Sequence, residues 1–211
     1  KRKSFRRRTI RRRGRKMPNK VLFEKAQFVT SCARKEQFLL DKPIVTLMGR
    51  SNVGKSTLIN SLTRMPSLMK TSKKPGRTQL VNYALVNSRF YLVDVPGYGF
   101  ASFRRDTFEG LMKNFIEENP KLRKIYILID SRRLLQEGDL EFSSYLGSLE
   151  IPYSFIFTKA DKLNTSERHF LDVQLKKVRE ETPEVLTFVS NDKDEKLFDL
   201  IRQDMIKVTR K

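Results

Sequence analysis

The sequence predicts an α/β fold in which a mostly parallel central sheet is covered by helices on both faces. Short β-branched, apolar segments alternate with amphipathic helical segments along most of the chain. The length of 211 residues fits one such domain with modest extensions. Polar and glycine-rich segments follow the predicted strands, and ligands bind at the carboxyl ends of strands in open parallel sheets.

The first half of the chain is predicted to begin with an entry segment at residues 21–40, whose apolar residues at mixed spacing suit a short helix. Pro43 then precedes a β-branched run typical of a buried strand. A glycine-bounded turn leads into the first helix, and Pro120 ends the second. In order, the elements are a strand at 44–48, a helix at 56–62, strands at 80–86 and 90–95, and a helix at 107–118.

The second half continues the alternation to the end of the chain. Its strands are β-branched or aromatic runs, and Pro152 precedes the second of them. Ser166 is the expected N-cap of a long helix, because its hydroxyl can accept a hydrogen bond from the first turn. In order, the elements are a strand at 125–130, a helix at 139–149, a strand at 153–158, a helix at 166–181, a strand at 185–189 and a helix at 195–208.

The positive charge is concentrated at the start of the chain. The formal net charge is +20, from 44 basic and 24 acidic residues. Residues 1–20 hold twelve of the basic residues and no acidic one, which leaves +8 for the rest. We expect 1–20 to be a disordered arm that orders on RNA, and 21–211 to be the folded domain. The chain starts at Lys1 rather than Met, and an Arg-rich, acid-free segment also suits an organellar import signal.

Composition excludes several classes of protein and site. No apolar run approaches the roughly 18–20 residues that cross a bilayer. The single cysteine, Cys32, excludes an internal disulfide framework and a four-cysteine zinc site, and is expected to be a small buried residue. The single histidine, His169, is expected to be solvated or half-buried on a helix, which excludes histidine-based catalysis.

The strongest local motif is a phosphate-binding loop at residues 49–56, which matches G-x-x-x-x-G-K-[ST] between a strand and a helix. In such a loop, backbone amides hold the β-phosphate beside the helix N-terminus. Lys55 supplies a positive charge to the β- and γ-phosphates, and the Ser56 hydroxyl binds Mg²⁺. The expected nucleotide contacts are Gly49, Arg50, Ser51, Asn52, Val53, Gly54, Lys55, Ser56 and Thr57.

Two later segments are expected to complete the phosphate and magnesium site. Asp94-Val95-Pro96-Gly97 ends a predicted strand, where Asp94 can hold Mg²⁺ through a water and the Gly97 amide can contact the γ-phosphate. In the preceding loop, the Thr78 hydroxyl can be the second protein ligand to Mg²⁺. The expected catalytic residues are Lys55, Thr78 and Gly97, and the added nucleotide contacts are Gly76, Arg77, Thr78, Asp94 and Gly97.

Guanine is favoured over adenine by Thr158-Lys159-Ala160-Asp161. The Asp161 carboxylate can accept hydrogen bonds from N1–H and the amino group of guanine, whereas adenine presents an acceptor at N1. The Lys159 stem can lie over the purine plane. Many GTPases carry Asn where this chain has Thr158. After the last strand, Ser190 and Asn191 can supply amides and a hydroxyl to the guanine carbonyl. GTP and GDP are therefore the expected ligands.

Together these motifs resemble the EngB (YihA/YsxC) family of GTPases over about residues 28–161, and more loosely to the C-terminus. The distinctive segments are 49–56, 71–79, 94–99 and 158–161, and Thr158 is normal for this family. The resemblance implies a P-loop GTPase that hydrolyses GTP with Mg²⁺, slowly without its ribosomal partner. It also implies an assembly factor for the large ribosomal subunit, monomeric when free, which binds ribosomal RNA, the precursor particle and other assembly factors. The departures are the reading Val-Ser-Asn at 189–191 in place of a serine pair, and the basic arm, which suits an organelle-specific extension.

Tyr98 leaves alternatives open, because it stands where Ras-like proteins place a water-orienting Gln. One alternative is that hydrolysis is assisted by a K⁺ ion, bound with help from Asn52, or by a partner. A second is that turnover is very slow. Tyr98 itself is then expected to pack against the loop without a catalytic role. The alternative functions are a nucleotide-bound rRNA-binding placeholder and a membrane-associated GTPase. The expected location is the mitochondrial matrix, with the plastid or the bacterial cytoplasm as alternatives.

Overall fold

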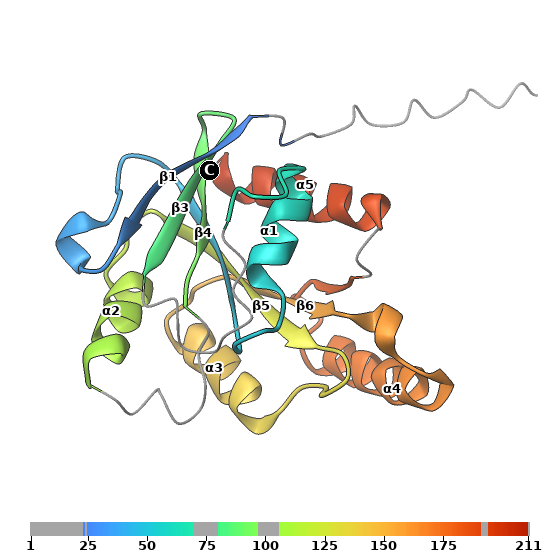
Figure 1. Cartoon of the computed structure of the whole chain (residues 1–211). Coiled ribbons are helices and arrows are strands. Elements are labelled where there is room, and N and C mark those ends of the chain that lie inside the picture. Colours follow the sequence, from blue (N-terminus) through green and yellow to red (C-terminus); the bar gives the residue numbers. More distant parts are fainter. Residues whose placement is uncertain (1–22, 24, 70–79, 97–105, 191–193, 211) are drawn as a thin grey trace, which may run out of the picture.

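The central sheet has seven strands in the order β1-β3-β4-β2-β5-β6-β7 (Figure 1). The structure is a computed structural model that describes residues 23, 25–69, 80–96, 106–190 and 194–210, with the backbone alone at 106–109. The strands from β4 to β7 along the sheet pair in parallel, while β3 pairs antiparallel with β4 and with β1. The strands are β1 Ala26–Cys32, β2 Ile44–Gly49, β3 Val81–Val86, β4 Phe90–Asp94, β5 Leu122–Asp130, β6 Tyr153–Thr158 and β7 Thr187–Val189.

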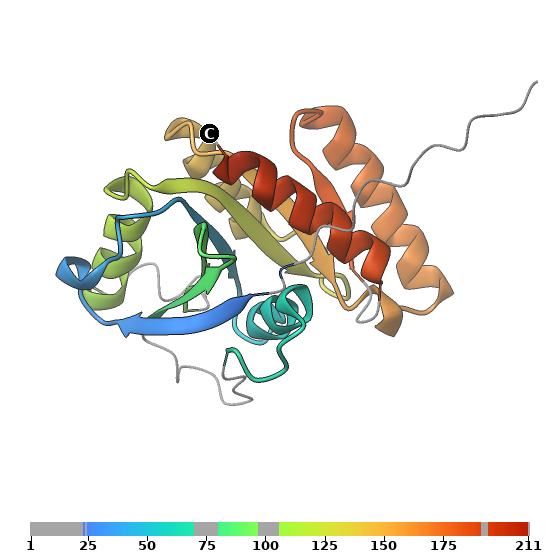
Figure 2. The ribbon, with the colours of Figure 1, turned by 90° about the horizontal axis from the view of Figure 1, so that it is seen from above.

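Helices cover both faces of the sheet, as the alternation of segments predicts (Figure 2). Buried residues of α1 and α5 pack on one face, and those of α2, α3 and α4 pack on the other. The predicted α/β fold is therefore confirmed. The α-helices are α1 Lys55–Thr63, α2 Asp106–Glu117, α3 Glu137–Ser148, α4 Thr165–Glu181 and α5 Glu195–Thr209, and the 3₁₀ helices are η1 Lys35–Gln37 and η2 Ala160–Lys162.

The central strands are apolar on both faces because helices cover both. Along β5, Ile125, Ile127 and Ile129 face one layer of helices, while Tyr126 and Leu128 face the other. All five side chains are almost completely buried. Successive side chains in a strand point to opposite faces, so this one strand contributes to both cores.

Two sequence-based expectations about element boundaries were wrong. The entry segment contains an edge strand, β1, besides its short 3₁₀ helix. A register shift between Phe28 and Thr30 breaks the alternation that would have revealed this strand. The cap of α4 is Asn164, not Ser166: its Oδ1 accepts from the Glu167 amide at 2.9 Å, and the Glu167 carboxylate accepts from the Asn164 amide at 2.8 Å. This reciprocal pair is a capping box.

The last helix is fastened to the first by a fully buried arginine. Arg202 donates through Nε to the Leu62 carbonyl at 2.8 Å and through Nη2 to the Ser61 carbonyl at 3.1 Å. Its Nη1 pairs with Asp199 and Glu195. These bonds add a donor to carbonyls in the last turn of α1, where the following turn is missing; the Ser61 carbonyl also accepts from the Arg64 amide at 3.2 Å. Within the described residues, no helix has the length and apolar character needed to cross a membrane.

Candidate nucleotide-binding site

The phosphate loop joins β2 to α1 through backbone conformations that only particular residues tolerate. Gly49 has φ +155°, and a Cβ there would lie 2.7 Å from the carbonyl oxygen of Leu128 on β5. Gly54 has φ +110° at the N-cap of α1. Asn52 is also left-handed, with φ 62°, and asparagine adopts this region more readily than most residues. The two glycines of the motif are therefore required by geometry before any ligand is considered.

Lys55 is held beneath this loop. Its ammonium donates to the carbonyl oxygens of Gly49 at 3.1 Å and Arg50 at 3.4 Å. The residue is only 8% exposed. Burial lowers the pKa of Lys55, and the charge of Asp94 acts in the opposite direction. The structure thus places a poorly hydrated cation at the loop, in position to contact a phosphate bound there.

Ser56 and Asp94, the two magnesium ligands expected from the described residues, are in direct contact. The Ser56 hydroxyl donates to Asp94 Oδ2 at 2.6 Å. The contact follows from topology, because Asp94 ends β4, which lies parallel to β2 immediately before the loop. Asp94 Oδ1 is buried, with no hydrogen-bond partner among the described residues. Burial raises the pKa of Asp94, although Lys55 and the Ser56 hydroxyl act to lower it.

The site offers one hydroxyl, from Ser56, and one carboxylate, from Asp94, whose Oδ1 has no described hydrogen-bond partner. Such oxygen donors are the ligands that a hard cation such as Mg²⁺ prefers. These residues therefore fit a magnesium ion. Within the described part of the chain, no cluster of three His, Cys, Asp or Glu side chains offers a protein-only metal site. Such an all-protein cage is not expected for Mg²⁺, which usually keeps waters and phosphate oxygens as ligands.

Thr158 connects the base motif to the phosphate loop. Its Oγ1 donates to the Val53 carbonyl at 2.8 Å and lies 3.2 Å from the Ile129 carbonyl. The side chain is buried. A threonine hydroxyl is short enough to make these contacts from the end of β6, which gives a structural reason for Thr at this position.

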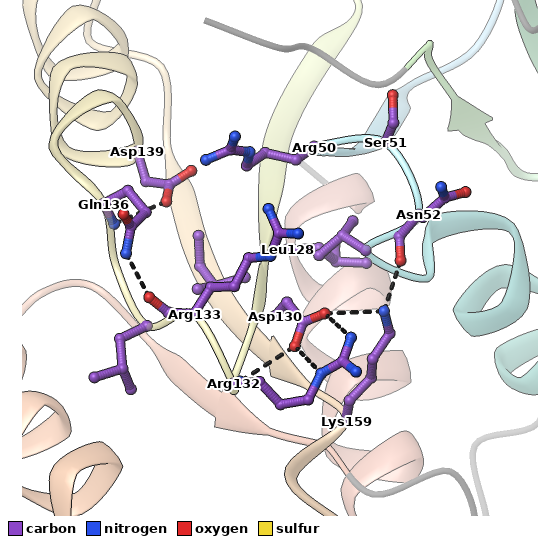
Figure 3. A pocket seen from close by; sticks show the side chains of 13 residues that line it. Arg50, Ser51, Asn52, Leu128, Asp130, Arg132, Arg133, Gln136, Asp139 and Lys159 are labelled. Atoms are coloured by element: carbon purple, nitrogen blue, oxygen red, sulfur yellow. Dashed lines mark hydrogen bonds and ion pairs between the residues drawn. The ribbon is translucent and has the colours of Figure 1, made fainter. Parts of the chain in front are cut away.

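Lys159 spans the gap between the same two segments. Its ammonium donates to the Asn52 carbonyl at 2.6 Å and to Asp130 Oδ2 at 3.0 Å (Figure 3). Asp130 ends β5, and its carboxylate also accepts two hydrogen bonds from the Arg132 guanidinium. The sequence reasoning missed Asp130 and Arg132. Their only local signal is a carboxylate at a strand end followed by arginines, which is common in loops.

Asp161 lies on η2, two residues after Lys159, with 29% of its side chain exposed. Its only described ion pair is with Lys162, at 3.1 Å. The backbone of Ser190 fixes this loop: its amide donates to the Phe157 carbonyl at 2.6 Å and its carbonyl accepts from the Ala160 amide at 3.3 Å. Of the fifth motif, Ser190 therefore lies beside the base motif, while Asn191 is outside the described residues.

A cavity of about 190 Å³ opens between these segments. The phosphate loop, α1, the base motif and Ser190 all contribute to its wall. Of the expected contacts, the cavity is lined by Val53, Gly54, Thr57, Thr158, Lys159 and Ser190. Gly76, Arg77, Thr78, Gly97 and Asn191, together with Tyr98 and the arm at 1–20, lie outside the described residues.

Two minor expectations agree with the structure. Cys32 is buried, and its Sγ lies 3.1 Å from the Gln37 carbonyl as a weak donor. Burial raises the pKa of its thiol. His169 is exposed on α4.

Comparison with protein families gives a match to the model described as "50S ribosome-binding GTPase" over residues 44–159. The "Probable GTP-binding protein EngB" of Fusobacterium nucleatum is 45% identical over 150 residues, which cover 69% of this chain and 77% of that protein. The protein of the same name from Phocaeicola vulgatus is 42% identical over 165 residues, covering 76% and 82% respectively.

Solved structures of low identity share the fold. The crystal structure of a probable GTP-binding protein engB has a TM-score of 0.59 at 24% identity, covering 79% of this chain and 98% of that one. Era in complex with MgGDPNP and a fragment of 16S ribosomal RNA has a TM-score of 0.60 at 18% identity, covering 81% and 57%. At these identities the likeness supports the architecture alone.

Proposed function

The chain belongs to the EngB family of GTP-binding proteins and is a GTPase, and on that premise we propose that it uses GTP binding and hydrolysis to assist assembly of the large ribosomal subunit. The observation that carries the proposal is the family match over residues 44–159, whose description names binding to the 50S ribosome. The charge of the chain supports it, since ribosomal RNA is a polyanion and the formal net charge is +20.

The proposed nucleotide contacts divide by position. Residues 49–57 and Lys55 in particular hold the phosphates, Asp161 reads the guanine, and Lys159 lies against the purine. Ser56 and Asp94 hold Mg²⁺, with Asp94 acting through a water and Thr78 as a further ligand. When bound, the ion offsets negative charge on the β- and γ-phosphates. Asp94 Oδ1, which is buried and has no hydrogen-bond partner within the described ranges, supports this assignment.

A basic surface in the described residues lies at the opposite end of the sheet from the nucleotide site. The β3–β4 turn is at the amino ends of the parallel strands. Lys25 is joined to this turn by two hydrogen bonds with Asn87: the Asn87 amide donates to the Lys25 carbonyl, and the Lys25 amide donates to Asn87 Oδ1. The C-terminal end of α5 reaches the same end of the molecule (Figure 1). Four exposed cations at this end of the molecule form no ion pair with any described side chain. They are Lys25, Arg89, Lys207 and Arg210.

Sedimentation of the protein with purified large-subunit precursors tests the ribosomal role. We expect co-sedimentation with a non-hydrolysable GTP analogue and release with GDP. Lys25→Glu combined with Arg89→Glu should weaken this association while GTP affinity stays the same. The matched control is Lys176→Glu combined with Lys177→Glu, which reverses two exposed charges on α4. Equal association in both nucleotide states, or no association at all, contradicts the proposal.

The basic arm is proposed to add RNA contacts to this surface. If six arm residues neutralise phosphates, affinity should fall by roughly three decades between 50 and 200 mM salt. Deleting residues 1–20 should remove most of that salt dependence and leave GTP binding intact. Binding that is equally tight and equally salt-dependent without the arm would leave it as an import signal only. We propose the mitochondrial matrix as its location; imaging the tagged full-length chain in its own cells tests this against the plastid and the bacterial cytoplasm.

Potassium is proposed as an aid to hydrolysis, because Tyr98 cannot orient water as a Gln does and Asn52 stands in the phosphate loop. Hydrolysis should be faster in K⁺ than in Na⁺ at equal ionic strength, since Na⁺ is too small to span the same ligands. Equal rates with and without ribosomal particles would remove this proposal and leave the ribosomal role standing.

A further inference from the structure

The lysine of the base motif is held at its charged end by a residue that none of the expected nucleotide contacts includes. Lys159 leaves β6 in the left-handed region, with φ 60°. Its ammonium donates to Asn52 on one side and to Asp130 on the other. An ammonium has three donors, so these two bonds fix most of its orientation.

Asp130 is itself fixed from the far side by Arg132. The guanidinium donates through Nε to Oδ1 at 2.9 Å and through Nη2 to Oδ2 at 2.6 Å, and the Arg132 amide donates to Oδ1 at 3.1 Å. A two-pronged arginine–carboxylate pair fixes the plane of the carboxylate as well as its distance. The Asp130 side chain is only 10% exposed, so it presents one fixed oxygen to Lys159.

The charge state of Asp130 is stable. Burial acts to raise the pKa of its carboxyl, but hydrogen bonds from Arg132 and Lys159 outweigh burial and hold the pKa well below its usual range. The carboxylate is therefore ionised at neutral pH, as an ion pair with Lys159 requires.

Lys159 is placed where its orientation matters to the ligand. It lines the base-side cavity, and it also lines a second cavity of about 140 Å³ on the α3 side of the phosphate loop (Figure 3). Asp130 and Arg132 line only the second of these two cavities. Lys159 thus borders both cavities, and Asp130 binds its ammonium from the side of the second cavity.

From this geometry we propose that Asp130 is a positioning residue for the guanine nucleotide. It never touches the ligand; it fixes the Lys159 ammonium, which keeps the lysine stem along the base cavity and joins the base motif to the phosphate loop at Asn52. Without the carboxylate, the ammonium keeps one protein acceptor and the long side chain regains rotamer freedom. The inference rests on GTP binding at this site and is independent of the ribosomal role.

Asp130→Asn is the primary test, because it keeps the shape and an acceptor for the Arg132 amide but removes the charge. We expect fluorescent GDP to dissociate about tenfold faster and KM for GTP to rise by a similar factor. Because the lost contact supports ground-state binding, kcat should stay within about twofold. Arg132→Gln should produce a smaller change in the same direction. Arg133→Gln, a change to the neighbouring exposed arginine that lines the same cavity, should leave dissociation unchanged.

A double-mutant cycle with Lys159→Met separates positioning from general support of the fold. If Asp130 acts through Lys159, Asp130→Asn adds nothing to the dissociation rate of the Lys159→Met protein. Additive effects overturn the proposal, as does a fall in kcat with unchanged KM. Equal effects of Arg132→Gln and Arg133→Gln also overturn it. Thermal melting checks folding, and if Asp130→Asn fails to fold, Arg132→Gln takes its place in the cycle.

Discussion

At the phosphate end of the site, formed by Lys55, Ser56 and Asp94, an ammonium and a carboxylate are buried and the serine is half-buried. At the base end, formed by Thr158, Lys159 and Ser190, polar groups are tied to neighbouring segments by short hydrogen bonds. Asp94 Oδ1 has no hydrogen-bond partner in the part of the chain that the structure describes, whereas Thr158 Oγ1 has two carbonyls within reach.

The difference indicates which half of the site is formed in advance. The base end is held by the protein itself and needs no ligand to keep its shape, so little ordering cost remains for binding. The phosphate end holds a cation and a carboxylate whose charges are poorly compensated until nucleotide and metal arrive. Substitutions at the phosphate end should therefore affect binding much more than folding, and those at the base end should affect both.

Lys55→Ala should give the largest effect. It removes the cation proposed to contact the β- and γ-phosphates, and GTP affinity should fall by at least about a thousandfold. The free energy of unfolding without nucleotide should fall by no more than about 2 kcal/mol, because the lost bonds join a buried ammonium to two carbonyls. Calorimetric titration and urea denaturation measure the two quantities. A loss of affinity under tenfold would contradict the assignment of Lys55.

Asp161→Asn should have the next largest effect, and it tests whether Asp161, next to the base end, recognises the guanine. The amide cannot accept both hydrogen bonds from guanine, so GTP affinity should fall by roughly a hundredfold. Affinity for xanthosine triphosphate should rise, because its C2 carbonyl suits an amide donor. Titrating both proteins with both nucleotides checks the exchange of preference. Unchanged GTP affinity would show that another residue reads the base.

Asp94→Asn should weaken the Mg²⁺ dependence of GTP binding and stabilise the free protein by about 1 kcal/mol, because a buried charge with one orphaned oxygen is removed. The folded-state pKa of Asp94 is raised. Its contribution to stability is therefore full below the ordinary carboxyl pKa and is lost as pH rises through the raised value.

The difference in unfolding free energy between Asp94→Asn and the native chain should grow in favour of the variant across that acidic range, and then level off. Urea denaturation at a series of pH values measures it. Carboxylates with a lowered pKa, such as Asp130 and Glu195, make the opposite contribution to the pH dependence of stability. Their contribution is the same in both proteins and cancels in the difference. A difference that does not vary with pH would mean that Asp94 is not destabilised by burial.

Thr158→Val should give the smallest effect, divided between folding and binding. It leaves the carbonyls of Val53 and Ile129 without this donor, which costs about 1–2 kcal/mol of stability. GDP should dissociate only a few-fold faster, since Lys159 still joins the two segments. Thr158→Ser retains the hydroxyl and should behave like the native chain in both thermal melting and stopped-flow dissociation. If Thr158→Val binds GDP and melts like the native chain, the Thr158 hydroxyl does not help to form the base end in advance.

The phosphate loop was predictable because its chemistry is contained in eight consecutive residues between a strand and a helix. The base motif was recognisable because its four residues, 158–161, are also consecutive and begin at the end of a strand. Asp130 was not, because its partner Lys159 is 29 residues away and only the parallel pairing of β5 with β6 brings them together. The Asn164 cap did have a local signal, since Glu167 follows it by three residues, but Ser166 offered a competing cap. β1 was hidden by its bulge and by its exposed edge position.

The buried Arg202 has a consequence for how the protein is made. Its guanidinium satisfies α1 carbonyls that lie 140 residues earlier in the chain. Synthesis proceeds from the amino terminus, so the phosphate loop and α1 leave the translating ribosome well before the residue that completes them. A nascent chain stalled before α5 carries the whole GTP motif set but lacks the fastening of its first helix. Closure of the last turn of α1 by Arg202 is thereby linked to completion of the polypeptide.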